Sequence, residues 1–138
     1  LGYSRASGIP YGQGLLKNRY VGRTFLQPDQ MQREIAVSLK FSPLRQAVQG
    51  KRVVLIDDSI VRATTTRHIV QLLKSAGAAA VHMRIASPPV RYPCFYGIDT
   101  PNQAELPASR MSREEICTMI GADTSFIITY LPPPMARR

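Results

Sequence analysis

Residues 52–66, RVVLIDDSIVRATTT, decide the fold that this sequence predicts. The nearly continuous run of β-branched and apolar residues over Arg52–Ile56 is typical of a parallel strand buried on both faces. Two adjacent carboxylates, Asp57 and Asp58, follow the strand, and a short loop then leads to a cluster of threonines. Apolar residues recur at helical spacing after the threonines, which predicts a helix that ends near Gly77. The inward face of this helix is expected to consist of Ile69, Leu72, Leu73 and Ala76.

Strands and helices are expected to alternate through the rest of the chain. Residues 81–86 (VHMRIA) and 125–130 (SFIITY) predict strands, and Ser112 to Glu115 form a capping box for a helix that ends at Gly121. Shorter elements are expected earlier, namely a helix over residues 1–7, a strand over 9–16 and a helix over 30–37. The order strand–helix–strand–helix–strand predicts an α/β fold with a parallel sheet and right-handed crossovers.

Composition indicates one globular domain with a basic surface. The chain has 138 residues, 44% hydrophobic and 20% charged, with a formal net charge of +9. This charge favours an anionic partner, namely nucleic acid, a membrane surface or a phosphorylated small molecule, although an inert basic surface explains it equally well. No apolar run has membrane-spanning length, and the two cysteines are far apart, so we expect a protein of the reducing cytosol. Basic residues do not form the dense block typical of a nucleic-acid-binding arm, which makes nucleic acid an unlikely partner.

The polar residues after the first long strand predict a site for a phosphorylated ligand. In open parallel sheets ligands bind beyond the carboxyl ends of the strands, where a helix start also presents free N–H groups to an anion. The hydroxyls of Thr64, Thr65 and Thr66 add donors for a phosphate group. Asp57 and Asp58 repel phosphate, but they suit sugar hydroxyls or a Mg²⁺ ion. The alternative is a polar loop that only caps the next helix.

Four segments carry a resemblance to one family. Residues 53–66 resemble the phosphoribosylpyrophosphate-binding signature of type I phosphoribosyltransferases. Residues 8–28 (GIPYGQGLLKNRYVGRTFLQP), 86–99 (ASPPVRYPCFYGID) and 121–126 (GADTSF) resemble segments of the amidophosphoribosyltransferases of purine synthesis, in register with the signature. The resemblance implies an N-terminally incomplete type I phosphoribosyltransferase fold over residues 1–130. It also implies an enzyme that makes 5-phosphoribosylamine from phosphoribosylpyrophosphate and glutamine-derived ammonia.

The resemblance also implies roles for individual residues. Asp57 and Asp58 would bind the ribose hydroxyls and Mg²⁺. The 5′-phosphate would be held by Ser59, Arg62, Ala63, Thr64, Thr65 and Thr66.

Residues 17–29 are similar to a flexible loop that closes over the substrate in this family. In that loop Lys17, Arg19 and Arg23 would face pyrophosphate, and Tyr20 would help to wall an ammonia channel. Such a lid agrees with the chemistry, because cations stabilise the departing pyrophosphate and closure excludes water from the reacting carbon.

Cys94 matches a cysteine that binds an iron–sulfur cluster in one branch of the family. A cluster needs four thiolates, so the other ligands would lie outside this chain and only a larger parent protein would hold it.

The sequence departs from the family pattern at several places. The glutaminase domain with its catalytic cysteine is absent, as are an upstream pyrophosphate loop and the first strands of the sheet, which would leave an exposed edge. Ala63 replaces a glycine; if this position has positive φ, the Cβ costs about 1 kcal/mol and would crowd the phosphate. Residues 131–138 (LPPPMARR) are expected to be a disordered tail. We therefore expect the isolated chain to lack activity, and the parent enzyme to be a homo-oligomer.

Two other function classes remain open on the sequence alone. One is a non-catalytic regulator with a phosphoribosyltransferase fold that binds a ligand or nucleic acid. The lid-like segment over 17–29 argues against it. The other is a salvage phosphoribosyltransferase that uses a free base.

Overall fold

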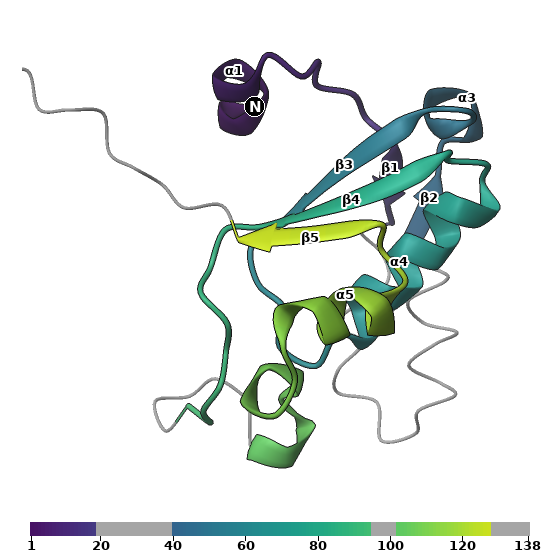
Figure 1. The fold of residues 1–138 in the computed structure, drawn as a ribbon. Helices are drawn as coiled ribbons and strands as arrows, with labels where there is room; N and C mark the ends of the chain where they lie inside the picture. The colour runs from purple at the N-terminus through teal and green to yellow at the C-terminus, as the bar shows by residue number, and fades with distance from the viewer. Residues whose placement is uncertain (19–39, 95–101, 128–138) are drawn as a thin grey trace, which may run out of the picture.

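A three-stranded parallel sheet forms the centre of the computed structural model, which describes residues 1–18, 40–94 and 102–127. The strand order is β3-β4-β5, and both neighbouring pairs are parallel. Helices α4 and α5 make the two crossovers and lie on the same side of the sheet (Figure 1). The bounds are β3 Arg52–Asp57, α4 Thr64–Ser75, β4 Ala80–Ile85, α5 Arg113–Ile120 and β5 Thr124–Ile127. The predicted α/β class with a parallel sheet is confirmed.

The beginning of the chain forms smaller elements outside this sheet. Helix α1 spans Gly2–Ser7 and ends at Gly8, whose φ of 71° is the left-handed conformation expected of a glycine cap. Strand β1 (Leu15–Lys17) pairs antiparallel with β2 (Phe41–Pro43), and the short helix α3 (Arg45–Val48) follows. The helix over residues 1–7 is thus confirmed, and the strand over 9–16 is confirmed only at its end. The expected helix over 30–37 lies outside the described residues.

Two short 3₁₀ helices, which the sequence analysis did not predict, precede α5. They are η2 (Gln103–Glu105) and η3 (Pro107–Ser109). The capping box of α5 is present: the Ser112 hydroxyl accepts from the Glu115 N–H, and the Glu115 carboxylate accepts from the Ser112 N–H. The helix ends at Gly121 with φ 73°, as predicted.

The core lies between the sheet and its two helices. Strand β4 alternates, with Val81, Met83 and Ile85 at most 5% exposed on the side of the helices. Helix α4 buries Thr66, Ile69, Val70 and Leu73. Of the predicted inward face, Leu72 is only half-buried, and the unpredicted Val70 takes a fully buried position. The helix begins at Thr64, so all three threonines belong to its first turn.

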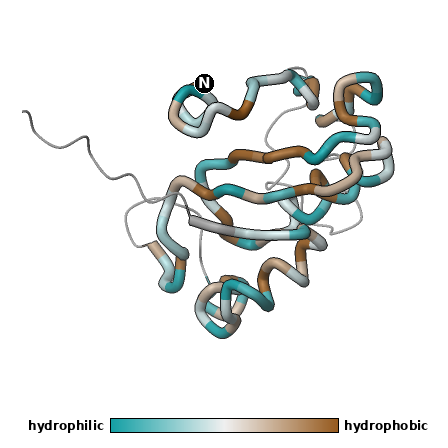
Figure 2. Tube along the Cα trace, turned by 45° about the horizontal axis from the view of Figure 1, so that its top comes forward, coloured by the Kyte–Doolittle hydropathy of each residue, from teal (hydrophilic) through white to brown (hydrophobic). Residues whose placement is uncertain are grey.

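Strand β3 is less buried than its sequence predicts. Figure 2 shows a hydrophobic stretch along it, but Val53, Val54 and Leu55 are half-buried and Ile56 is 45% exposed. The expectation of burial on both faces is therefore wrong for the described part of the chain. Within that part β3 is the outer strand of its sheet, and residues 1–15 border a hollow of about 310 Å³ beside it. The helices in the described ranges lack the combined length and hydropathy that a membrane crossing requires.

Asp123 connects three elements at the amino-terminal edge of the sheet. Its Oδ2 accepts a hydrogen bond from the Val81 N–H at the start of β4 (2.7 Å) and lies 3.2 Å from Nζ of Lys74 in α4. The N–H of Val81 holds the pKa of Asp123 below its usual value, with help from Lys74. Asp123 thus contributes stability above pH 4, approximately the carboxyl pKa in an unfolded chain, and this contribution is lost as the pH falls through the lower folded pKa.

We expect Asp123→Ala to lower the free energy of unfolding by about 1 kcal/mol at pH 7, because it leaves the Val81 N–H without its charged acceptor. Asp123→Asn keeps an acceptor oxygen and should cost less. Urea unfolding at pH 7 and at pH 3 measures both, and the loss in Asp123→Ala should shrink at pH 3. An equal loss at the two pH values would contradict the role of the ionised carboxylate.

Candidate functional site

The carboxylate pair lies where β3 ends. Asp57 is the last residue of the strand and is half-buried, whereas Asp58 is exposed in the loop. The Asp57 Oδ1 accepts from the Asp58 N–H (3.0 Å), and the Asp58 Oδ1 accepts from the Ser59 hydroxyl (3.1 Å). Each carboxylate therefore has one oxygen engaged by a neighbouring residue, so the orientation of both side chains is restrained.

Burial raises the pKa of Asp57 above its usual value. The hydrogen bond from the Asp58 N–H opposes this shift, and the negative charge of Asp58 adds to it. The negative charge of an ionised Asp57 is therefore only partly balanced by hydrogen bonds in the described structure. A cation or a hydrogen-bond donor from a ligand would relieve this penalty, which is the pattern expected of a binding carboxylate.

The segment after β4 is hydrogen-bonded to the backbone of the carboxylate pair. The Ala86 N–H donates to the carbonyl of Asp57 (3.1 Å), and the Ser87 N–H donates to the carbonyl of Asp58 (2.8 Å). These bonds continue the parallel ladder beyond the strands and hold residues 86–87 beside the carboxylates. Sequence reasoning placed no site residue here, because backbone bonds leave no side-chain signal.

The start of α4 follows the same loop and presents N–H groups that have no acceptor within the helix. The first hydrogen bond within the helix runs from the Arg67 N–H to the Ala63 carbonyl (2.9 Å), so the N–H groups of Thr64, Thr65 and Thr66 have no acceptor in the helix. The side chains of Thr64 and Thr65 are exposed, whereas Thr66 is only 4% exposed. The structure thus brings together N–H groups and two accessible hydroxyls in an arrangement suited to a phosphate group.

Ala63 precedes the helix with a φ of 63°, and it is the one residue other than glycine with positive φ in the described ranges. The conditional prediction of positive φ at this position is confirmed. Its side chain is 6% exposed and belongs to a core cluster with Met83, Ile85, Ile116 and Ile120. The methyl group thus packs into the core, which argues against the predicted crowding of a phosphate.

Arg62 is connected to a distant element. Its Nε donates to Oε2 of Glu105 in η2 at 2.8 Å, and the two residues are 43 positions apart. Sequence reasoning grouped Arg62 with the phosphate ligands and did not find Glu105. No spacing or motif links the two residues, so only the fold reveals the contact.

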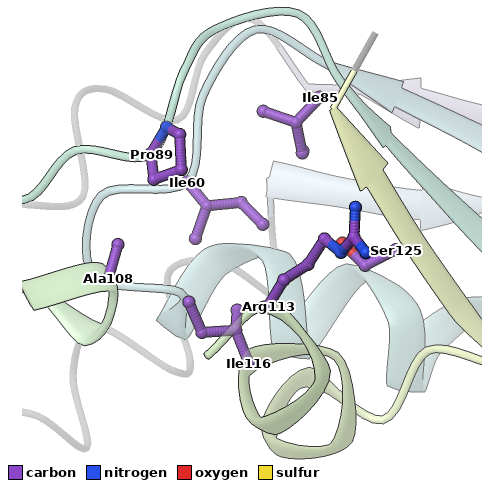
Figure 3. Close-up of a pocket in the computed structure, with 7 residues that line it drawn as sticks. All are labelled: Ile60, Ile85, Pro89, Ala108, Arg113, Ile116 and Ser125. Atoms are coloured by element: carbon purple, nitrogen blue, oxygen red, sulfur yellow. The ribbon is translucent and has the colours of Figure 1, made fainter. Parts of the chain in front are cut away.

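A small apolar hollow of about 50 Å³ lies behind this loop, toward α5 (Figure 3). Ile60 from the loop, Ile85 at the end of β4 and Ile116 of α5 line it, with Pro89, Ala108, Arg113 and Ser125. Its volume leaves room for only a few water molecules, so we assign it no ligand. Ile60 also packs against the neighbouring core cluster of Ala63, Met83, Ile85, Ile116 and Ile120, and this contact attaches the loop to the core.

The donor set at the loop fits a hard divalent cation. Mg²⁺ prefers carboxylate oxygens and is commonly held by one or two of them, with waters and substrate oxygens completing its shell. Asp57 and Asp58 supply such a pair. Within the described residues no group of three or more His, Cys, Asp and Glu side chains forms a complete metal site, so the protein would hold the ion only in part.

The two cysteines do not supply a cluster site. Cys94 and Cys117 are not joined in a disulfide, and Cys117 donates to the carbonyl of Ala122 (3.3 Å). Burial raises the pKa of Cys117, which disfavours the thiolate that a metal requires. Because the whole chain has only two cysteines, it does not fit a cluster of four thiolates on its own.

The predicted lid residues are largely outside the described structure. Lys17 is exposed at the end of β1, in register with Phe41 of β2, so the first residue of the predicted loop over 17–29 is also the last residue of a strand. Arg19, Tyr20 and Arg23 lie outside the described residues, as does the predicted tail.

Comparison with curated proteins identifies relatives of one kind. The chain is 60% identical over 124 residues to amidophosphoribosyltransferase of Bacillus subtilis, 56% identical over 124 residues to that of Synechocystis, and 53% identical over 130 residues to the chloroplastic amidophosphoribosyltransferase 1 of Arabidopsis thaliana. These alignments cover 90–94% of this chain and 23–26% of the relatives. The chain therefore spans about a quarter of the length of the curated relatives it matches. No family model matches the chain.

Solved structures give the same result. A glutamine phosphoribosylpyrophosphate amidotransferase from B. subtilis, complexed with ADP and GMP, matches with a TM-score of 0.78 and 58% identity. A structure described as the allosteric regulatory enzyme of purine biosynthesis matches with a TM-score of 0.77 and 58% identity. Both matches cover 93% of this chain and 28% of the solved chain. The resemblance drawn from the sequence is confirmed.

We expect Ala63→Gly to change the free energy of unfolding by less than about 1 kcal/mol. Relief of the left-handed conformation is worth about 1 kcal/mol, whereas loss of the buried methyl group costs about 0.8 kcal/mol and the greater freedom of glycine in the unfolded chain costs about as much. Affinity for ribose 5-phosphate should not change, and calorimetric titration tests it. If Ala63→Gly bound ribose 5-phosphate about tenfold more tightly than wild type, the methyl group would be shown to crowd the phosphate.

We expect Asp57→Asn to stabilise the unliganded protein at pH 7. Because the folded pKa of Asp57 is raised, its ionisation costs stability as the pH rises above the unfolded value, and the amide removes that cost. Below both pKa values the carboxyl is neutral, so the gain should disappear at pH 3. Thermal melting at the two pH values checks this. A variant that is destabilised at pH 7 would contradict it.

Proposed function

We propose that this chain, a homologue of one segment of the amidophosphoribosyltransferases, forms the part of such an enzyme that binds phosphoribosylpyrophosphate and transfers its phosphoribosyl group to ammonia. The observation that carries the proposal is the single loop between β3 and α4. This loop places the carboxylates Asp57 and Asp58 at one end and, at the other, the N–H groups of Thr64 to Thr66, which have no acceptor within the helix. A ribose phosphate needs both kinds of partner, since its hydroxyls donate and its phosphate accepts.

The two ends of the loop would bind different parts of the ligand. The 5′-phosphate would lie at the start of α4, bound by backbone N–H groups and by the hydroxyls of Thr64 and Thr65, with Ser59 and Ala63 shaping the loop. Asp57 and Asp58 would accept hydrogen bonds from the ribose hydroxyls and fix the sugar ring. A Mg²⁺ ion bound to these carboxylates would neutralise charge on the pyrophosphate group. Fixed at both ends, the ribose would present C1 to the incoming ammonia.

The basic residues of the 17–29 segment complete the proposal on the leaving-group side. Lys17, Arg19 and Arg23 would stabilise the departing pyrophosphate, and Tyr20 would border the path of ammonia. The sequence resemblance supports these roles. The structure adds that Lys17, the first residue of the segment, is the last residue of β1. Closure over the substrate would keep water from attacking C1 in place of ammonia.

Ammonia would come from glutamine, hydrolysed by a glutaminase domain that these residues do not contain. The parent enzyme would be a homo-oligomer. A cytosolic location is consistent with two cysteines that form no disulfide in the described residues. An iron–sulfur cluster bound through Cys94 would require cysteines outside this chain.

Binding of phosphoribosylpyrophosphate with Mg²⁺ tests the proposed site. We expect Asp58→Asn and Asp57→Asn each to weaken binding at least about tenfold in calorimetric titrations, because the neutral amide lacks the negative charge with which the carboxylate attracts the cation. Glu114→Gln is a matched control, since it neutralises an exposed carboxylate on α5. Affinity equal to wild type in both aspartate variants would remove these residues from the site.

Turnover by the 138 residues alone is expected to be absent, because they span about a quarter of the relatives' length and the whole reaction uses groups beyond them. The measurement is pyrophosphate release with excess ammonia and Mg²⁺, compared with a reaction without protein. Release that Asp58→Asn abolishes would show that this segment suffices for catalysis.

A further inference from the structure

The Arg62–Glu105 ion pair joins two elements that meet only through the fold. Arg62 lies in the loop before α4, and Glu105 is the last residue of η2. The side chains are 23% and 48% exposed, and the Nε–Oε2 distance is 2.8 Å. Ion pairs at such exposure contribute little to overall stability. A role for this pair therefore has to be local, in the geometry of the loop.

The backbone around Glu105 is restrained by hydrogen bonds and by a buried neighbour. The Asn102 side chain caps η2, and the Ser109 hydroxyl donates to the carbonyl of Leu106 (2.8 Å). Leu106, the residue after Glu105, is 1% exposed and anchors the turn in the core. The carboxylate thus approaches Arg62 from a rigid support.

The loop is held on its other side by Ala63. The methyl group of Ala63 belongs to the core cluster that includes Ile116 and Ile120 of α5, and its backbone adopts positive φ. Arg62 is the residue immediately before this turn. The two contacts together restrain the chain just before the N–H groups of Thr64 and Thr65. A shift of Arg62 would move those groups, because nothing but the Ala63 turn separates them.

We propose that Glu105 is a positioning residue, which acts through Arg62 to fix the loop before α4 for a phosphorylated ligand. Arg62 itself then positions the loop and does not bind the phosphate directly. The inference rests on the proposed function, since it takes the phosphate to lie at the start of α4. It departs from the role that the sequence resemblance gave to Arg62.

The two roles of Arg62 predict opposite effects of Glu105. If Arg62 bound phosphate directly, the Glu105 carboxylate would compete for the guanidinium group, and its removal would tighten binding. If the pair fixes the loop, removal of either partner loosens it and weakens binding. Loss of a negative charge close to a phosphate site should otherwise favour the anion, so weaker binding in Glu105→Gln has no simple electrostatic explanation.

A double-mutant cycle separates these roles. Affinity for ribose 5-phosphate is measured by calorimetry for wild type, Glu105→Gln, Arg62→Gln and the double variant. We expect each single change to weaken binding about fivefold, and the double variant to be no weaker than either, because both remove the same contact. Glu114→Gln is the matched control: it breaks an ion pair of 3.1 Å with its neighbour Arg113 and should leave affinity unchanged.

Amide hydrogen exchange gives a readout that needs no ligand. The Arg67 N–H, bonded to the carbonyl of Ala63, should exchange severalfold faster in both single variants than in wild type. In the double variant it should exchange no faster than in either single variant. If wild type fails to bind ribose 5-phosphate, the proposed function falls, and exchange alone decides the role of the pair. Three results would each overturn the inference. They are exchange rates unchanged from wild type, tighter binding of ribose 5-phosphate by Glu105→Gln, and a further full loss of affinity when Arg62→Gln is added to Glu105→Gln.

Discussion

The parallel pairing of β3 with β4 is the constraint on which the rest of the structure depends. It runs in register from Arg52 opposite Ala80 to Asp57 opposite Ile85, and two further backbone bonds from Ala86 and Ser87 extend it into the loops. Parallel strands require a crossover, so α4 must return across one face of the sheet, and the same pairing brings the carboxyl ends of both strands to one edge. The site is therefore a consequence of the sheet. The carboxylates end the strand, and the helix that must follow begins beside them with its N–H groups free.

The chain can turn from β3 into α4 this sharply because Ala63 accepts a left-handed conformation. An alanine costs more than a glycine there, and its methyl group offsets the cost by filling a core position against α5. This contact makes the loop depend on the second crossover helix, which lies far along the chain. The ion pair between Arg62 and Glu105 adds a second connection of the same kind. A loop that would be flexible from its sequence alone is thus supported by η2, η3 and α5.

Sequence reasoning recovered what depends on local pattern. The apolar run over Arg52–Ile56 predicted β3 and the capping box at Ser112 predicted α5, because strand pattern and helix capping are read from neighbouring residues. The doublet Asp57–Asp58 pointed to a candidate site by its charge alone, and its binding role stays a prediction. Sequence reasoning failed where three-dimensional context decides. Ile56 is exposed although its strand pattern predicts burial, Val70 replaces Leu72 in the core, and Glu105 was not found, because the partner of a side chain across 43 residues has no local signal.

The two edges of the sheet carry carboxylates with opposite pKa shifts. At the amino-terminal edge Asp123 is ionised at low cost, because the Val81 N–H and Lys74 both favour its charge. At the carboxyl edge Asp57 is ionised at a cost, since burial and Asp58 disfavour its charge. An ionised Asp123, beside the start of β4, therefore stabilises the fold, whereas an ionised Asp57, opposite Ile85 at the end of β4, destabilises it. A carboxylate left with uncompensated charge gains more from a cation or a sugar hydroxyl than one already satisfied, because the ligand removes a penalty that the folded protein otherwise carries. Asp57 is the last residue of β3, and its backbone is held by the pairing with β4 and by the Ala86 N–H, so the strand restrains this carboxylate from moving toward solvent.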